Sequence, residues 1–444
     1  MKPPTSDNKK STVRHTRAIA RALTKGQNVA PPDAEVECLL REVIQPATWA
    51  QVAHFQQMGL RERVLTLPAM VAFVLSLLWR HLGSVREGVR VLHQEGMLWT
   101  APLPVTQQAM QQRLQTLPPV LFERILTEVL PTLQKRWRDR DRPLNPAIGH
   151  ALQHFSAVLA LDGSTLDSLS RKVGLTAQQT GFALAGRMAA LLDIGSLLPR
   201  KVWYEADSLA HDQVFWQSAL NALEPGVLLL FDLGFVNHAL FDQMTEQKIA
   251  FVTRLKTNAR FTVTQVLREG PRFLDALITL GVGKSQCAAT FRMVCVLYGG
   301  VWHRYLTNVT DPALLPTEYV VALYWQRWRI EEAYLTVKRL LGLSYFATTH
   351  QNGVMVQVWA TWILYAVLTD LTDAVAQELQ QPFALVSIEM VFRGLYHFSQ
   401  AYSKGKADDP IVYLAEKARE LAILKAKRPK SLDAVALLTN QLKA

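Results

Sequence analysis

Cysteine is scarce in this chain of 444 residues, which contains only Cys38, Cys287 and Cys295. An odd count without any C-x-x-C spacing argues against a disulfide framework and against a cysteine zinc site. It is typical of free thiols in a reducing cytoplasm, which is where we expect this protein. Internal repeats are also absent, so the sequence does not indicate a solenoid or a propeller.

Long uncharged runs are few. Residues 64–79 carry no charge but are too few for a membrane span of about 20 residues. Residues 340–369 lack Asp, Glu, Lys and Arg, but contain several Ser, Thr, Asn and Gln side chains that are costly in lipid. We therefore expect a buried helix over residues 354–371 and no membrane partner. The first 32 residues are polar and basic, without the apolar core of a signal peptide, and predict a flexible tail.

Acidic residues are in deficit. The chain has 37 Asp and Glu against 48 Lys and Arg, a formal net charge of +11. This balance favours a polyanionic partner, nucleic acid first and an anionic membrane surface second. Because many soluble proteins are as basic, the charge alone does not decide the function.

The pattern of apolar and polar residues changes several times along the chain. These changes predict an α/β protein in which a mixed sheet is flanked by helices. Apolar residues at helical spacing indicate an all-helical N-terminal domain, broken at Leu117-Pro118-Pro119 and closed by a basic linker over 135–142. The linker can be interpreted as a solvated helix end or as a set of phosphate contacts.

Further along the chain, a helix is expected at 209–223 and another from Pro316 past Arg339. Strands are expected at 155–161, 186–194, 201–206, 227–231 and 249–255, with a hairpin of strands 288–298 and 301–309 joined by Gly299-Gly300. The expected domains are a tail (1–32), the helical domain (33–150), a first core part (151–258), an inserted β subdomain (259–312), a second core part (313–400) and a basic helical C-terminal region (401–444).

Two acids follow fully apolar strands. Asp162-Gly163 comes after residues 155–161, and Asp232 comes after residues 227–231. Open α/β sheets place their ligand sites at the carboxyl ends of strands. A single Asp at such a position is more often a turn former or a helix cap, but two on buried strands indicate a paired site.

The predicted helix over 322–341 carries the strongest signal. At about 100° per residue, Tyr324, Arg327, Glu331 and Lys338 fall on one face. The opposite face is apolar and suits packing on a sheet. An aromatic, two cations and a carboxylate in line suit a metal ion and DNA phosphates, although an exposed face with an Arg327–Glu331 ion pair is the plain alternative. The neighbouring Glu332 lies about 100° further round, which favours Glu331 as the ligand.

These four residues match the Tyr-x2-Arg-x3-Glu-x6-Lys signature of the insertion-sequence-four family of DDE transposases. Asp162-Gly163-Ser164 resembles the first Asp motif of that family, and Asp232-x-Gly234-Phe235 resembles the second. The resemblance covers residues 155–370, and includes the strand 251–256 and the segment 306–308. One position departs from it, because many relatives carry Arg where this chain has Leu233.

The resemblance implies an RNase H-like catalytic core in which Asp162, Asp232 and Glu331 hold two Mg²⁺ ions, which Mn²⁺ can replace. It implies that Tyr324, Arg327 and Lys338 hold the transposon-end DNA, and we expect further DNA contacts at Arg254 and Lys256. The implied partners are double-stranded DNA, as terminal inverted repeats and as target, and a second copy of the chain in a synaptic homodimer. The N-terminal helices would recognise the repeats or serve packing and dimerisation. A nuclease without strand transfer, an inactive DNA-binding relative and, more distantly, a membrane protein remain as alternatives.

Overall fold

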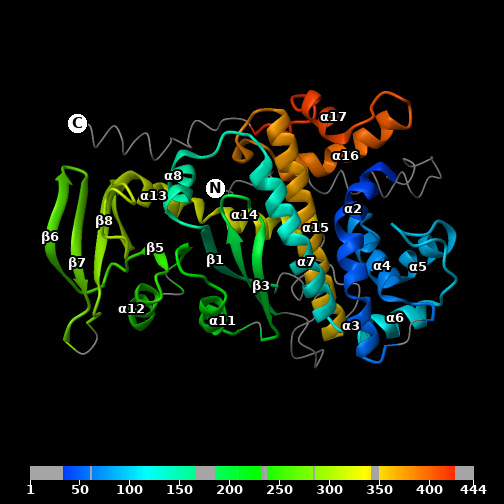
Figure 1. Ribbon diagram of the computed structural model, residues 1–444, viewed down its shortest axis with the longest axis horizontal. Helices are drawn as coiled ribbons and strands as arrows, with labels where there is room; N and C mark the ends of the chain where they lie inside the picture. The colour runs from blue at the N-terminus through cyan, green and yellow to red at the C-terminus, as the bar shows by residue number, and fades with distance from the viewer. Residues whose placement is uncertain are drawn as a thin grey trace, which may run out of the picture.

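The computed structural model describes residues 34–60, 63–166, 186–207, 209–232, 234, 238–283, 286–341 and 350–425. The expected basic tail at 1–32, the position Phe235 and the end of the C-terminal region at 426–444 lie outside these residues. One large sheet occupies one end of the molecule and a group of helices the other, with α7 and α15 running between them (Figure 1). The predicted mixed α/β architecture is confirmed.

The segment before the sheet is helical. Thr66 and Ser84 begin two of its helices by accepting hydrogen bonds from the backbone N–H groups of Ala69 and Glu87. The predicted break at Pro118-Pro119 is confirmed, since one helix ends at Thr116 and the next begins at Val120. The helices are α2 (Ala34–Ala50), α3 (Val52–Gln57), α4 (Leu67–Trp79), α5 (Val85–Gln94), α6 (Gln107–Thr116), α7 (Val120–Asp139) and α8 (Pro146–His154).

The described strands form one sheet of nine, in the order β3-β2-β1-β4-β5-β9-β8-β7-β6. Strands β1, β4 and β5 pair in parallel, and all other neighbours pair antiparallel. The strands of the expected insertion join this sheet through β5 and β9 instead of building a separate one. The strands are β1 (Val158–Thr165), β2 (Arg187–Asp193), β3 (Pro199–Glu205), β4 (Leu228–Phe231), β5 (Ala250–Arg254), β6 (Phe261–Gly270), β7 (Phe273–Leu280), β8 (Thr290–Tyr298) and β9 (Val301–Thr307).

The central strands are buried on both faces, which explains their unbroken apolar runs. Successive residues of β1 alternate between two cores, with Val158 and Ala160 facing one and Leu159 and Leu161 the other. The first core continues into the N-terminal helices. The second is closed by α11 (Trp216–Asn221) and α12 (His238–Glu246). The helix predicted at 209–223 is therefore too long, because a 3₁₀ turn, η1 (Asp212–Phe215), precedes the short α11.

The predicted buried helix over 354–371 is confirmed and is longer than expected. Helix α15 (Gln351–Glu378) is long and apolar enough to cross a membrane, but almost all of its apolar window is buried inside the protein. It contacts α7, α4, α6 and strand β3. The 3₁₀ turn η5 (Phe383–Leu385), α16 (Ile388–Tyr402) and α17 (Pro410–Glu416) follow, and α16 and α17 pack back on it.

The basic linker at 135–142 contains the end of α7 and is solvated only in part, because Lys135 and Arg138 are exposed whereas other arginines of the linker are paired with acids. Arg140 Nη1 lies 2.7 Å from Asp370 Oδ1, and Arg142 Nε lies 2.5 Å from Asp373 Oδ1. Both acids belong to α15 and are buried. Because a buried carboxylate is costly without a partner, these arginines fix the end of α7 to the central helix.

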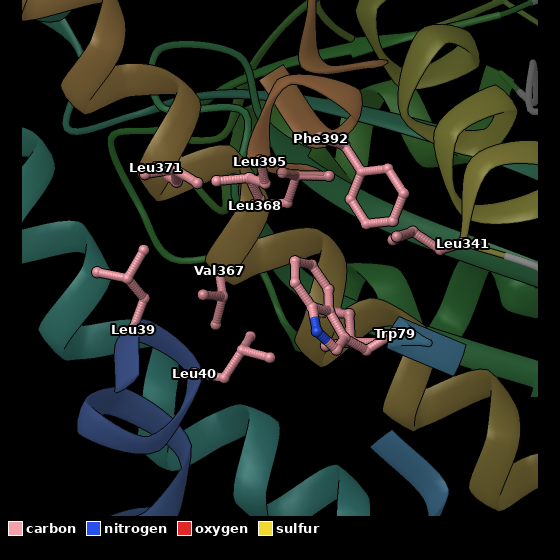
Figure 2. A pocket seen from close by; sticks show the side chains of 10 residues that line it. Leu39, Leu40, Trp79, Leu341, Val367, Leu368, Leu371, Phe392 and Leu395 are labelled. Carbon is pink, nitrogen blue, oxygen red and sulfur yellow. The ribbon is translucent and has the colours of Figure 1, made fainter. Parts of the chain in front are cut away.

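A small apolar cavity lies where the N-terminal helices meet α15 and α16 (Figure 2). It has a volume of about 20 Å³ and sits directly beyond Leu341, at the end of the segment that carries Lys338. Its lining is entirely apolar and consists of Leu39, Leu40, Trp79, Leu341, Leu364, Val367, Leu368, Leu371, Phe392 and Leu395.

Candidate active site

The two predicted aspartates lie side by side where two parallel strands part. The register of β1 and β4 ends at the pair Leu161 and Phe231, and Asp162 and Asp232 are the next residues on each chain. The sequence predicted that Asp162 comes directly after its strand. It lies inside β1 instead, because β1 continues to Thr165 along β2. The continued pairing with β2 fixes the backbone on both sides of Asp162.

The helix that carries the third carboxylate is interrupted, which corrects the prediction of one continuous helix from Pro316 past Arg339. Helix α13 (Thr317–Gln326) ends before Arg327, α14 (Arg329–Leu335) follows after one turn, and η4 (Thr336–Leu340) is a π-helix. Arg327 and Trp328 keep right-handed helical backbone angles, so the chain continues in a helical path across the break. The predicted common face is retained, because Tyr324, Arg327 and Lys338 all reach β1 or the end of β4. Tyr324 and Arg327 are each only 4% exposed and face the sheet instead of solvent.

The junction between α13 and α14 reaches all three carboxylates. The Tyr324 hydroxyl donates to Asp232 Oδ1 at 3.0 Å. Arg327 Nη1 donates to Asp162 Oδ2 at 2.7 Å, and Arg327 Nη2 donates to Glu331 Oε1 at 3.1 Å. One guanidinium thus bridges the carboxylates of a strand and a helix that are 169 positions apart in the sequence (331 − 162).

The charges of this cluster act on one another. Burial, together with the nearby negative charges of Glu331 and Asp232, raises the pKa of Asp162 to about 6. The Arg327 guanidinium and a hydrogen bond from Gly163 N–H oppose these effects on that pKa. Burial and the Asp232 carboxylate also raise the pKa of Tyr324 far above its usual range, so its hydroxyl keeps its proton.

Two further contacts fix the helix segment of Glu331 on β1. The Tyr334 hydroxyl donates to the backbone carbonyl of Asp162 at 2.6 Å. Lys338 Nζ, on the π-helix, donates to Ser164 Oγ at 2.6 Å and to the Thr165 carbonyl. Isolated π turns occur frequently at functional sites, and here the turn directs the lysine at the strand of the first aspartate.

The start of α13 is anchored by a fully buried ion pair. Arg292 on β8 donates to both carboxylate oxygens of Asp275 on β7, at 2.8 and 2.6 Å. The hydroxyl of Thr317, the first residue of α13, donates to the same carboxylate at 2.6 Å. The β-rich segment therefore anchors the first residue of the helix that carries Tyr324.

The predicted DNA contacts Arg254 and Lys256 lie at the end of β5 and two residues beyond it. The parallel register of β4 and β5 places Arg254 beside Asp232 on the neighbouring strand. Arg254 is partly buried near the His303 ring, and Lys256, two residues further, is exposed. Neither is bonded to the carboxylates among the contacts of the described residues.

The donor chemistry of the site fits a divalent cation. All three side chains supply carboxylate oxygens, the ligands that Mg²⁺ prefers, and their mutual repulsion at Asp162 is the charge that such an ion would neutralise. In the described part of the chain, however, no three His, Cys, Asp or Glu side chains are arranged around one ion position. Arg327 holds Asp162 and Glu331 on its guanidinium instead.

Two charged residues near Asp162 were missed by the sequence reasoning. Arg187 begins β2 opposite Thr165, and Asp212 begins η1, with its carboxylate against Gly163. Nothing in the local sequence distinguishes either residue from an ordinary surface charge, since the contact joins positions 25 apart.

The comparisons with known proteins place the resemblance on this part of the chain. Residues 154–367 match the family described as transposase DDE domain. A protein of Sinorhizobium fredii that carries the name of a transposase, y4zB, is 30% identical over 155 residues, which are 33% of this chain and 43% of that protein. A protein of Geobacillus stearothermophilus, named as a transposase for insertion sequence element IS5377, is 25% identical over 186 residues, 41% of this chain and 48% of that protein. The chain thus matches somewhat under half the length of these curated relatives. The comparisons support a DDE transposase, and the matched residues contain all three carboxylates.

Proposed function

We propose that this chain is the transposase of an insertion sequence, which cuts the ends of its element and joins them to target DNA. The observation that carries this proposal is the gathering of Asp162, Asp232 and Glu331 from two strands and a helix onto Tyr324 and Arg327. The Tyr-x2-Arg-x3-Glu-x6-Lys signature supports placing the chain in the insertion-sequence-four family, with an RNase H-like core.

The three carboxylates would hold two Mg²⁺ ions, or Mn²⁺ in their place. When bound, such ions activate the attacking oxygen and stabilise the leaving oxygen of an in-line displacement at phosphorus. The protein itself would position the three carboxylates. Pairing of β1 with β2 fixes Asp162, Tyr324 orients Asp232, and the contacts of Tyr334 and Lys338 fix the helix segment of Glu331 against β1.

DNA would approach the three carboxylates from the side on which the basic side chains of the site lie. We propose that Tyr324, Arg327 and Lys338 position the carboxylates and exchange internal partners for phosphate oxygens when transposon-end DNA is bound. Arg254 and Lys256 would contact the same strand beside Asp232. The substrates would be terminal inverted repeats and target DNA, handled by a homodimer in the bacterial cytoplasm, with the N-terminal helices reading the repeats.

A strand-cleavage assay tests the proposal. Purified protein is mixed with labelled DNA from the ends of its element and Mg²⁺ or Mn²⁺, in parallel with Glu331→Gln. We expect cuts at the element ends and joined products, both lost in the variant. Cleavage without joined products would make the protein a nuclease, binding without cleavage would make it an inactive relative, and cleavage that survives Glu331→Gln would place the site elsewhere.

A further inference from the structure

A second charged pair lies beside the carboxylate centre. The Arg187 guanidinium donates through Nη2 to Asp212 Oδ1. Their side chains are 17% and 24% exposed, so the pair is largely buried but still reached by solvent. In the register of β1 and β2, Arg187 lies opposite Thr165, three residues beyond Asp162, or roughly 10 Å along the strand.

Asp212 lies against the backbone of both aspartate motifs. A Cβ atom at Gly163, the residue after Asp162, would collide with Asp212 Oδ1. A Cβ atom at Gly234, two residues after Asp232, would lie 3.7 Å from Asp212 Oδ2. Glycine at 163 therefore leaves room for this carboxylate, which in turn holds the guanidinium of Arg187 next to the site.

The hydrogen bonding of Arg187 is incomplete. Its Nε is buried and has no hydrogen-bond partner within the described residues, although a guanidinium can donate five hydrogen bonds. A second cation stands at the same place, because Lys338 Nζ bonds the carbonyl of Thr165, the residue opposite Arg187. The charges of Arg187 and Asp212 both act on Tyr334, whose hydroxyl bonds the Asp162 carbonyl.

We propose that Arg187 binds a phosphate of the DNA strand that enters the carboxylate centre, and that Asp212 holds Arg187 in place until this phosphate replaces it. A guanidinium fork matches the oxygens of a phosphodiester as it matches those of a carboxylate. The exchange moves no proton. It needs only that the Asp212 carboxylate and the DNA phosphate compete for the Arg187 guanidinium. The inference rests on the proposed function, because it takes DNA as the substrate.

The test is DNA binding measured against salt. Full-length protein in EDTA is titrated into a fluorescent duplex with the element end, over a series of KCl concentrations, for wild type, Arg187→Gln, Asp212→Asn and the double variant. Arg200→Gln is the matched control, because Arg200 is also paired with an aspartate, Asp193, near the other end of β2.

We expect Arg187→Gln to weaken binding and to reduce the slope of log affinity against log salt by about 1, the loss of one phosphate contact. Asp212→Asn removes the competing anion, so it should bind DNA several-fold more tightly with the wild-type slope. The double variant should resemble Arg187→Gln, and Arg200→Gln should resemble wild type.

Three outcomes would overturn the inference. They are an unchanged slope in Arg187→Gln, weaker binding in Asp212→Asn, or an equal loss of slope in Arg200→Gln. If Arg187→Gln does not fold, Arg187→Lys replaces it, and must keep the wild-type slope while binding more weakly. Absence of DNA binding by wild-type protein would instead contradict the proposed function itself.

Discussion

Replacing the first aspartate should make the protein more stable while it destroys the activity. Burial and neighbouring carboxylates raise the pKa of Asp162 from 3.8 to about 6. Between these two pH values, Asp162 is therefore protonated in the folded protein but has lost its proton in the unfolded chain. Stability falls with rising pH wherever the folded state binds more protons, so this group destabilises the fold as the pH rises from about 4 to about 6.

The size of the effect follows from the same shift. A pKa difference between 3.8 and about 6 corresponds to about 3 kcal/mol of folding free energy, all of it lost above pH 6. Because asparagine imitates the protonated carboxyl, Asp162→Asn should be more stable than wild type by about 3 kcal/mol near pH 7.5. The two proteins should be equally stable near pH 4, where wild-type Asp162 is protonated as well.

Urea unfolding in EDTA, followed by circular dichroism at both pH values, measures this difference. Glu332→Gln is the control, because the Glu332 side chain is 58% exposed and its ion pairs with Arg329 and Lys425 are open to solvent on that side, so its replacement should change stability by less than about 1 kcal/mol. An Asp162→Asn protein that is less stable than wild type at both pH values would contradict this expectation. It would mean that the bond to Arg327 stabilises the fold more than burial of the charge destabilises it.

Three other substitutions probe the parts that position the site. Tyr324→Phe removes the hydroxyl that holds Asp232, and should lower the cleavage rate at saturating DNA roughly tenfold, for about 1.5 kcal/mol, without unfolding the protein; an unchanged rate would remove Tyr324 from the site. Asp275→Ala leaves the Arg292 guanidinium buried without its carboxylate, and should destabilise the fold by about 3–5 kcal/mol in urea unfolding; a change under about 1 kcal/mol would show that the pair is dispensable. Val367→Ile adds a methylene towards the apolar cavity and should raise stability by about 1 kcal/mol in the same assay, whereas destabilisation would show that the space is already filled.

The sequence predicted those parts of the fold that depend on the pattern of neighbouring residues. The runs at 155–161 and 227–231 are wholly apolar because both faces of β1 and β4 are buried, and their two aspartates meet because the strands are parallel neighbours. Pro118-Pro119 separates α6 from α7 by the chemistry of proline alone.

What sequence could not predict depends on contacts between distant residues. No Gly or Pro occurs between residues 317 and 340, so local signals indicate one unbroken helix. The interruption at Arg327 and Trp328 accompanies contacts of Tyr324 and Arg327 with acids on two strands. The arginines of the linker likewise pair with Asp370 and Asp373, more than 200 positions away, and Asp212 reaches Arg187 and Gly163 only through the fold.

In the proposed function, Asp162, Asp232 and Glu331 ligate the metal ions of a strand-cutting centre. A change of ligand chemistry at Asp232 tests this assignment. In Asp232→Cys a thiolate replaces a carboxylate oxygen, and Mg²⁺ accepts sulfur poorly whereas Mn²⁺ accepts it better. We predict that this variant loses cleavage of element-end DNA in Mg²⁺ and recovers it in Mn²⁺, while Asp232→Ala is inactive in both. Equal cleavage by the cysteine variant and wild type in Mg²⁺, or recovery of the alanine variant in Mn²⁺, would contradict the claim that Asp232 binds the metal.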